Sequence, residues 1–257
     1  MPAGNALREF PEDEDAGHMP TDFVLLGVGA MNSPRYRPAG LLIASRRHRV
    51  MLDGGGTAVP RPPLDAWLVS DKRAELMPDI RRRCKTFSLN PAVAEFTATD
   101  VDEVQRITPL PVVHTSHRTY GYLINCGQYR VVWAPEFWEF PVWAQGADLM
   151  FADAAGWLRP IRFAKGAGGH AAVHDTAERA RRAGVRRLIF AHIGRPSIRA
   201  MDAGEQPPYG EWGIEGNAYR PESASLRRAA DGGPVHGSRA DHRQATSDRI
   251  PENQHHP

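Results

Sequence analysis

The chain has 257 residues, of which 41% are hydrophobic and 24% are charged, and its formal net charge at pH 7 is only +2. This composition suits a globular domain with a substantial core, and the small charge gives no global field that would attract nucleic acid or an anionic membrane. Two cysteines exclude a disulfide framework, and no apolar run reaches the roughly 18 residues of a membrane helix. The N-terminus also lacks a signal-peptide pattern, so we expect a reduced, cytoplasmic protein.

Both ends of the chain are predicted to be disordered tails around a single domain of residues 21–221. Residues 1–20 are acidic and interrupted by Pro and Gly, and residues 222–257 are poor in apolar residues. Met19 directly precedes the first expected strand, so both Met1 and Met19 are candidate start codons.

The middle of the chain is rich in apolar runs that predict strands. In chain order these are 22–30, a hairpin pair at 39–45 and 48–56, then 63–71, two strands within 120–136 that turn at Gly127, and 146–154. Residues 174–185 predict a helix with Asp175 as its cap and Gly184 as its stop, and this helix leads into a strand at 188–190.

Several of these strands end in an acidic or imidazole side chain. Each of these residues alone has an ordinary role, since Asp caps turns and a buried His satisfies a carbonyl group. Together, converging His and carboxylate groups provide the ligands that a divalent cation needs. The six strand tips carry Asp53, Asp71, His114, Glu136, Asp153 and His192.

Three blocks in this order resemble the metallo-β-lactamase superfamily. They are "FVLLGVGAMNSPRYRPAGLLIASRRHRVMLDGGG", "PLPVVHTSHRTYGYLINCGQYRVVWAPE" and "GHAAVHDTAERARRAGVRRLIFAHIGRP". The branches that these blocks resemble are the tRNA-maturing ribonucleases and the cyclic phosphodiesterases of phosphonate breakdown. The resemblance implies a single-domain α/β fold, the four-layer αββα sandwich, with the site at one edge of its two sheets.

The resemblance also implies roles for individual residues. His192 is similar to the last ligand histidine of the family, and His114 to the middle one, with His117 as a weaker candidate for that place. Glu136 stands where the family has a bridging aspartate, and Asp53 stands at a structural aspartate beside the site.

His170 resembles a histidine that assists phosphoester cleavage in the ribonuclease branch. Its alternative role is that of a polar residue in a glycine loop. Asp153 is expected to support the site from the end of its strand.

The superfamily's His-x-His-x-Asp-His motif is replaced in this sequence. The corresponding stretch reads "WLVSDKRAELMPDI", which puts Asp71, Arg73, Glu75 and Leu76 in the places of the four ligands. Arginine is a permanent cation and leucine has no donor atom. The two-metal cluster of the family is therefore predicted not to assemble.

One interpretation of this loss is an atypical hydrolase that uses a single metal ion. His114, Glu136 and His192 would hold the ion, with zinc expected and manganese or iron as alternatives, and an activated water would cleave a small-molecule phosphodiester or related ester. Arg73 would replace the missing cation and bind an anionic group, while Asp71 or Glu75 would accept a proton or orient Arg73. The ordinary alternative for this stretch is a solvated helix start with Asp71 as N-cap.

Two other interpretations stay open. In the first, the chain is a catalytically inactive ligand-binding protein without metal, whose pocket is shaped by the first loop with Asn32, Arg35 and Arg37. In the second, which the near-neutral charge disfavours, the partner is RNA. A homodimer is compatible with each of these interpretations.

Overall fold

The computed structural model describes residues 21–99, 104–163 and 168–221. The two predicted tails lie outside this part of the chain. The described residues form two large β-sheets, a small two-stranded sheet, three α-helices and a short 3-10 helix at Val142–Ala144.

The first sheet has five strands in the order β14-β1-β2-β3-β4. Their bounds are Ala218–Tyr219, Asp22–Gly27, Gly40–Ala44, Arg49–Asp53 and Ala66–Leu68. The predicted hairpin is confirmed as β2 and β3, which pair antiparallel, whereas β3 and β4 are parallel.

The second sheet has seven strands in the order β13-β12-β9-β8-β7-β6-β5. Their bounds are Glu211–Trp212, Arg187–Ile193, Leu149–Ala154, Tyr129–Ala134, Thr119–Cys126, Val104–Val112 and Phe96–Thr99. The predicted turn at Gly127 joins β7 to β8, and Gly127 has a φ of 54° that favours glycine. A separate two-stranded sheet pairs β10 (Ile161–Arg162) with β11 (Gly169–His170).

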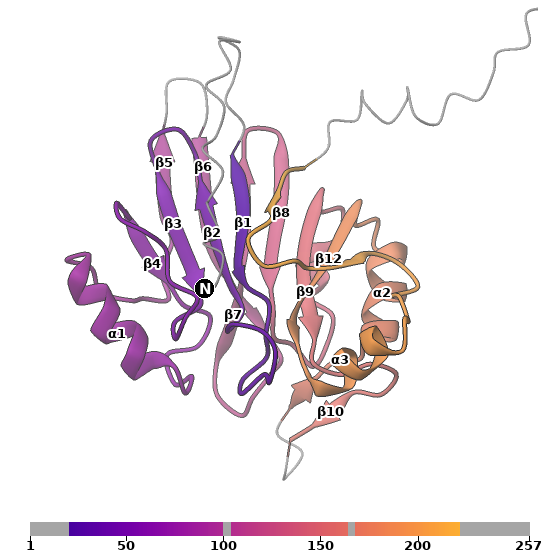
Figure 1. Cartoon of the computed structure of the whole chain (residues 1–257). Coiled ribbons are helices and arrows are strands. Elements are labelled where there is room, and N and C mark those ends of the chain that lie inside the picture. Colours follow the sequence, from indigo (N-terminus) through magenta and orange to yellow (C-terminus); the bar gives the residue numbers. More distant parts are fainter. Residues whose placement is uncertain (1–20, 100–103, 164–167, 222–257) are drawn as a thin grey trace, which may run out of the picture. The chain divides into compact units, whose positions relative to one another are not determined.

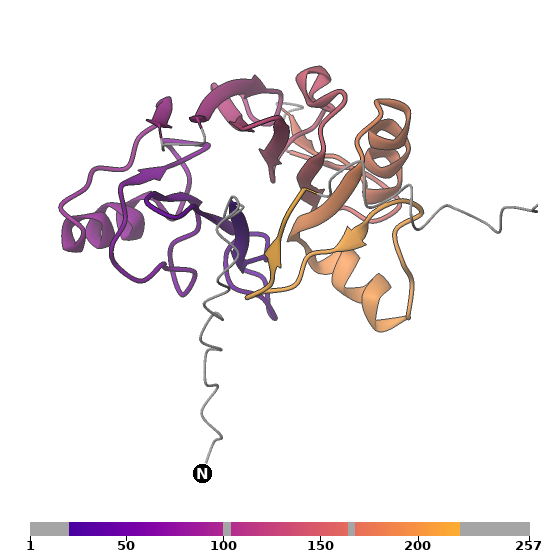
Figure 2. The same ribbon diagram turned by 90° about the horizontal axis from the view of Figure 1, so that it is seen from above.

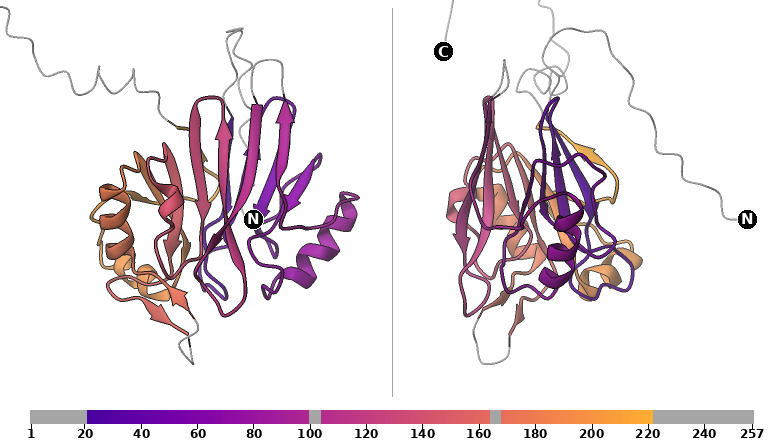
Figure 3. Two further views of the ribbon diagram at one scale, coloured as in Figure 1. Left: turned by 180° about the vertical axis from the view of Figure 1, so that it is seen from behind. Right: turned by 90° about the vertical axis from the view of Figure 1, so that its left-hand side faces the viewer.

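The two large sheets pack face to face around the main core (Figures 1 and 3). Phe23, Leu25 and Leu41 from the first sheet share this core with Val131 and Phe190 from the second, and all five side chains are fully buried. Alternating apolar residues on facing sheets form such a core because each strand turns every second side chain inward.

Helix α1 (Met77–Thr86) covers the outer face of the first sheet, while α2 (Val173–Arg182) contacts β9 and β12 of the second. Figure 2 shows α1 at the opposite end of the described domain from α2 and α3 (Arg195–Asp202). The outer core under α1 contains Leu42, Met51, Trp67, Met77, Ile80 and Cys84. The layers are thus helix, sheet, sheet, helix, and the predicted αββα sandwich is confirmed.

Two local predictions were wrong at helix starts. Ala172, not Asp175, holds the N-cap position of α2, and Asp175 lies in the first turn, where its charge favours the helix dipole. Helix α1 begins at Met77 with Leu76 in the cap position, so Asp71 does not cap it. Among the described residues, none of the helices is long and apolar enough to cross a membrane.

Candidate functional site

The strand order brings the polar strand ends to one edge of the second sheet. Strands β8, β9 and β12 are mutually parallel neighbours. Their carboxyl ends therefore lie together, and they carry Glu136, Asp153 and His192. Strand β6 runs antiparallel to β7, which is antiparallel to β8, so His114 follows the end of β6 at the same edge.

Glu136 joins two histidines into a trio at this edge. Its Oε2 lies 3.2 Å from Nε2 of His114, and its Oε1 lies 3.2 Å from Nδ1 of His192. Both imidazoles are buried. The Nδ1–H of His114 donates a hydrogen bond to the carbonyl oxygen of Gly169 at 2.8 Å, which fixes the ring and turns its other nitrogen toward Glu136.

The pKa values of the trio shift in different directions: that of the carboxyl is lowered, that of one imidazole is raised and that of the other is lowered. Burial alone would raise the pKa of Glu136, but the charges of His192 and His114 outweigh it and hold this pKa below its usual range. Burial would lower the pKa of His114, but its contact with Glu136 raises it to about 9. Burial and the neighbouring imidazoles lower the pKa of His192. Without a metal ion, His114 therefore carries a proton at neutral pH and directs it toward Glu136.

A second pair, Asp153 and His170, lies directly beside the trio. The Nδ1–H of His170 donates to Oδ2 of Asp153 at 2.7 Å, and the Asp153 side chain is fully buried. The His170 ring stacks on His192 with centroids 5.0 Å apart, and its centroid is 4.7 Å from that of His114. Burial would lower the pKa of His170, but Asp153 and Glu136 together raise it.

Asp53 anchors the edge of the first sheet that faces the trio. Its Oδ1 accepts hydrogen bonds from the backbone N–H and the hydroxyl of Ser70, at 2.6 and 2.9 Å, and its Oδ2 accepts one from Nε1 of Trp133 at 2.7 Å. Burial nevertheless raises the pKa of this carboxyl to about 6. Asp53 thus links both sheets beside the site, as a supporting residue would.

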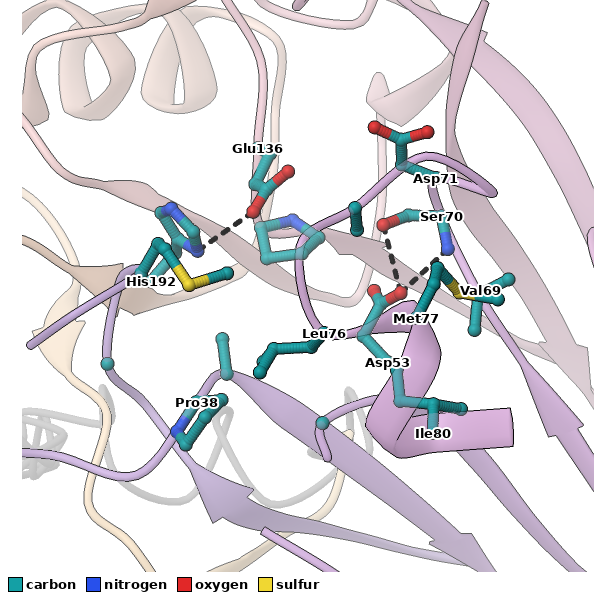
Figure 4. Close-up of a pocket in the computed structure, with 16 residues that line it drawn as sticks. Pro38, Asp53, Val69, Ser70, Asp71, Leu76, Met77, Ile80, Glu136 and His192 are labelled. Carbon is teal, nitrogen blue, oxygen red and sulfur yellow. Dashed lines mark hydrogen bonds and ion pairs between the residues drawn. The ribbon is translucent and has the colours of Figure 1, made fainter. Parts of the chain in front are cut away.

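A narrow cavity of about 50 Å³ lies between Asp53 on the first sheet and Glu136 and His192 on the second (Figure 4). Asp53, Ser70, Asp71, Glu136 and His192 contribute its polar wall. Asp53 and His192 both have positive φ values, 53° and 54°, which are strained for residues with a Cβ. Such strained positions cluster where side chains must be aimed at a site.

Residues 71–80 contribute mainly apolar side chains to this cavity. Ala74, Leu76, Met77 and Ile80 line it, together with Asp71. Arg73 and Glu75 are exposed, and neither of them lines the cavity. The expectation that Arg73 replaces the missing cation beside Glu136 was therefore wrong, because the turn after Asp71 directs Arg73 toward a neighbouring pocket.

His117, the weaker candidate for the middle ligand, belongs to a different contact. Its Nε2–H donates to Oδ2 of Asp71 at 2.8 Å, while Oδ1 of Asp71 accepts the backbone N–H of Arg73 at 2.7 Å. Asp71 therefore binds His117 and the backbone of Arg73. Among the described residues, it forms no hydrogen bond or ion pair with the Arg73 guanidinium.

The first loop does not bring its predicted polar residues into the cavity. Asn32 is exposed, Arg35 pairs with Asp202 at 2.8 Å, and Arg37 pairs with Glu215 at 3.1 Å. Both arginines therefore fasten the loop to later parts of the chain. Met31 and Pro38 line the cavity from this loop instead.

The donor set of the trio has the chemistry of a site for one divalent cation. Two imidazoles and a carboxylate are ordinary zinc ligands, and donors that share one tetrahedral ion lie about 3.3 Å apart. The separations of 3.2 Å from Glu136 to each of the two histidines match that spacing. Within residues 21–99, 104–163 and 168–221, however, no three or more such side chains already surround a metal position. The two histidines face different oxygens of Glu136, so its carboxylate must rotate to bring the three donors together.

Phe163 is a neighbour of the site that the sequence pattern did not indicate. The ring of Phe163 packs edge-on against His114 and His170, with centroids 5.3 Å from each. It lies one residue beyond the two-residue strand β10, where no hydrophobic periodicity is long enough to reveal it. Phe163 shields one side of both imidazoles from water.

The family model described as the beta-lactamase superfamily domain matches residues 59–193, which is more than half of the chain. No curated protein matches.

Solved structures share the fold at low sequence identity. The metallo-β-lactamase fold protein YhfI from Bacillus subtilis is 15% identical, with a TM-score of 0.59, over 78% of this chain and 99% of that chain. A diphosphatase of the PhnP family is 15% identical, with a TM-score of 0.58, over 78% and 97%. The short form of human tRNase Z is 12% identical, with a TM-score of 0.55, over 79% and 100%. A further neighbour with a TM-score of 0.51, PqqB from Methylobacterium extorquens, is Zn²⁺-bound. At these identities the likeness concerns the fold.

Proposed function

The chain belongs to the metallo-β-lactamase superfamily, a family of hydrolases whose fold generally binds divalent metal ions, and we propose that it hydrolyses a small phosphodiester or related ester with one such ion. The observation that carries this proposal is the trio of His114, Glu136 and His192 at the sheet edge, with two donor separations of 3.2 Å. These three side chains would hold the ion, for which zinc suits the donor set and manganese or iron are alternatives. Held by these residues, such an ion would supply Lewis-acid polarisation of the ester and would lower the pKa of a water molecule.

The residues around the trio have roles of their own in this proposal. Gly169 fixes the orientation of His114 through its carbonyl oxygen, and Asp153 fixes that of His170. Because Nδ1 of His170 is bound to Asp153, its Nε2 is the nitrogen left to exchange a proton with substrate. Burial would lower the pKa of His170, but Asp153 and Glu136 raise it, and this direction favours the protonated ring that donates to the leaving oxygen of an ester. The cavity wall of Ala74 and Leu76 excludes water beside the trio.

A second candidate function is ligand binding without catalysis or metal. It is favoured by one observation, namely that the trio satisfies its own charges: Glu136 contacts both histidines, and the pKa of His114 is raised to about 9. A metal would have to displace that proton. This function retains the pocket but predicts neither bound metal nor turnover.

Hydrolysis of bis(4-nitrophenyl) phosphate by the full chain tests the first function. We expect turnover that a chelator abolishes, and a His170→Gln variant that is about 10²- to 10⁴-fold slower, as is typical for loss of a general acid. His174→Gln is the matched control, because His174 lies in α2 and packs its ring on Trp157. Turnover that survives complete chelation, or an unchanged His170→Gln rate, would contradict the proposal. No turnover, with the fold intact, would favour the binding function.

A further inference from the structure

A second pocket adjoins the candidate site on the other side of Asp71. Its volume is about 280 Å³, slightly below the roughly 300–1,000 Å³ of pockets that hold whole drug-sized ligands. It therefore suits one chemical group of a larger molecule. Asp71 lines both this pocket and the cavity of the trio, so the two are direct neighbours. We call it the cationic pocket, and it is lined by Asp71, Lys72, Arg73, Val93, His117, Arg118 and Tyr120.

Three cationic side chains line this pocket without a carboxylate partner among the described residues. Lys72, Arg73 and Arg118 are exposed, and none of them makes an ion pair among the residues that the structure describes. Other arginines of the domain do have such partners, for example Arg35 with Asp202 and Arg106 with Glu95. The three like charges repel one another, so their convergence on one pocket has a cost that a bound anion would remove.

Asp71 does not neutralise this charge, because both of its oxygens are already engaged. One accepts the backbone N–H of Arg73 and the other accepts Nε2–H of His117. The Asp71 carboxyl is buried, whereas the three cationic side chains are exposed to the pocket. Three cations against one paired carboxylate leave the pocket clearly positive.

The two chain segments that carry the cations are tied together. The backbone N–H of Tyr120 donates to the carbonyl oxygen of Ser70 at 3.0 Å, and His117 contacts Asp71 at 2.8 Å. These two bonds hold residues 70–73 beside residues 115–120, while the hydroxyl of Thr115 orders the second segment by donating to the carbonyl oxygen of His117 at 2.9 Å. The backbone of the pocket is thus in place before any ligand arrives, which lowers the entropy that binding costs.

We propose that the cationic pocket binds a phosphate group of the substrate, so that the substrate carries a phosphate in addition to the ester bond cleaved beside the trio. Arginine binds phosphate oxygens in pairs through its planar fork, and lysine adds a point charge. His117, oriented by Asp71, adds a further polar edge. This inference rests on the proposed function in one respect, namely that the ester bond is cleaved beside the trio. The binding of phosphate in the cationic pocket does not depend on the proposed function.

Calorimetric titration of the full chain with inorganic pyrophosphate, at about 0.15 M salt, tests the proposal. We expect saturable binding, and a Kd that rises about tenfold or more in the double variant Arg73→Ala/Arg118→Ala. The matched control is Arg181→Ala/Arg199→Ala, which removes the same charge from two exposed arginines of α2 and α3. Its Kd should stay within about twofold of the wild-type value.

The variant His192→Ala separates this inference from the proposed function. If pyrophosphate binds through the cationic pocket, His192→Ala retains the wild-type Kd even where it has lost metal. Binding that His192→Ala abolishes and Arg73→Ala/Arg118→Ala retains would place the anion at the trio and overturn the inference, while supporting the metal site. No binding by the wild type, or equal loss in both double variants, would also overturn it. Specific binding by a chain that contains no metal would support the inference and contradict the proposed function.

Discussion

Glu136→Gln is expected to lower kcat/KM for phosphodiester hydrolysis by more than about a hundredfold. Loss of a residue that only orients a metal ligand typically costs 10- to 100-fold, and Glu136 is itself the carboxylate that contacts both histidines. The amide has the size of the carboxyl, but it carries no charge and turns a donor toward one imidazole. The measurement is the rate with bis(4-nitrophenyl) phosphate, alongside the metal content of the variant.

Two further variants make this prediction specific. Glu139→Gln, at an exposed position three residues later, should retain wild-type activity. Glu136→Asp restores the residue type that the family resemblance implies there, and should keep part of the activity because the charge remains. A Glu136→Gln variant with the wild-type rate would show that the trio is not the reaction centre.

Asp153→Asn is expected to reduce the free energy of unfolding by about 2–4 kcal/mol. The Asp153 carboxylate is fully buried and accepts hydrogen bonds from the backbone N–H groups of Phe137 and Ala155 and from Nδ1–H of His170. All three partners are donors, so the NH₂ group of asparagine must face a donor and leave it unsatisfied. Urea denaturation of the full chain measures the effect.

Asp175→Asn serves as the control for this stability prediction. Asp175 is exposed in the first turn of α2, so losing its charge should cost less than about 1 kcal/mol. Equal stabilities of Asp153→Asn and the wild type would mean that the buried carboxylate is not held as the structure describes. If Asp153→Asn hydrolyses the ester more slowly but unfolds at the wild-type urea concentration, Asp153 orients His170 without stabilising the fold.

Much of the fold could be predicted from the sequence because strand and helix signals are local. The alternation and apolar runs of residues 22–30, 120–136 and 146–154 appear as strands, and the order of three blocks indicated how the strands assemble. Glu136, Asp153 and His192 were expected to converge because each follows the end of a strand, and the structure places those ends at one edge because strands β8, β9 and β12 are parallel neighbours. The sequence prediction that His114, Glu136 and His192 hold a metal stays a prediction.

The parts that could not be predicted depend on where exposed side chains point and on contacts distant in sequence. The pairing of Asp71 with His117 joins residues 46 positions apart, and no local pattern encodes it. Arg73 was assigned to the trio from its place in the replaced motif, but a turn held by Asp71 directs it outward. Arg35 and Arg37 were expected in the pocket, yet their partners Asp202 and Glu215 come from the far end of the domain.

The most direct test of the single-metal account is the metal content of the full chain, measured by elemental mass spectrometry beside His192→Ala. Histidines at positions 236, 242, 255 and 256 are present in both proteins, so metal that they bind cancels in the comparison. The account predicts about one zinc, manganese or iron ion per wild-type chain and its loss in His192→Ala. Metal at background in a folded wild type, or an equal content in both proteins, would contradict it.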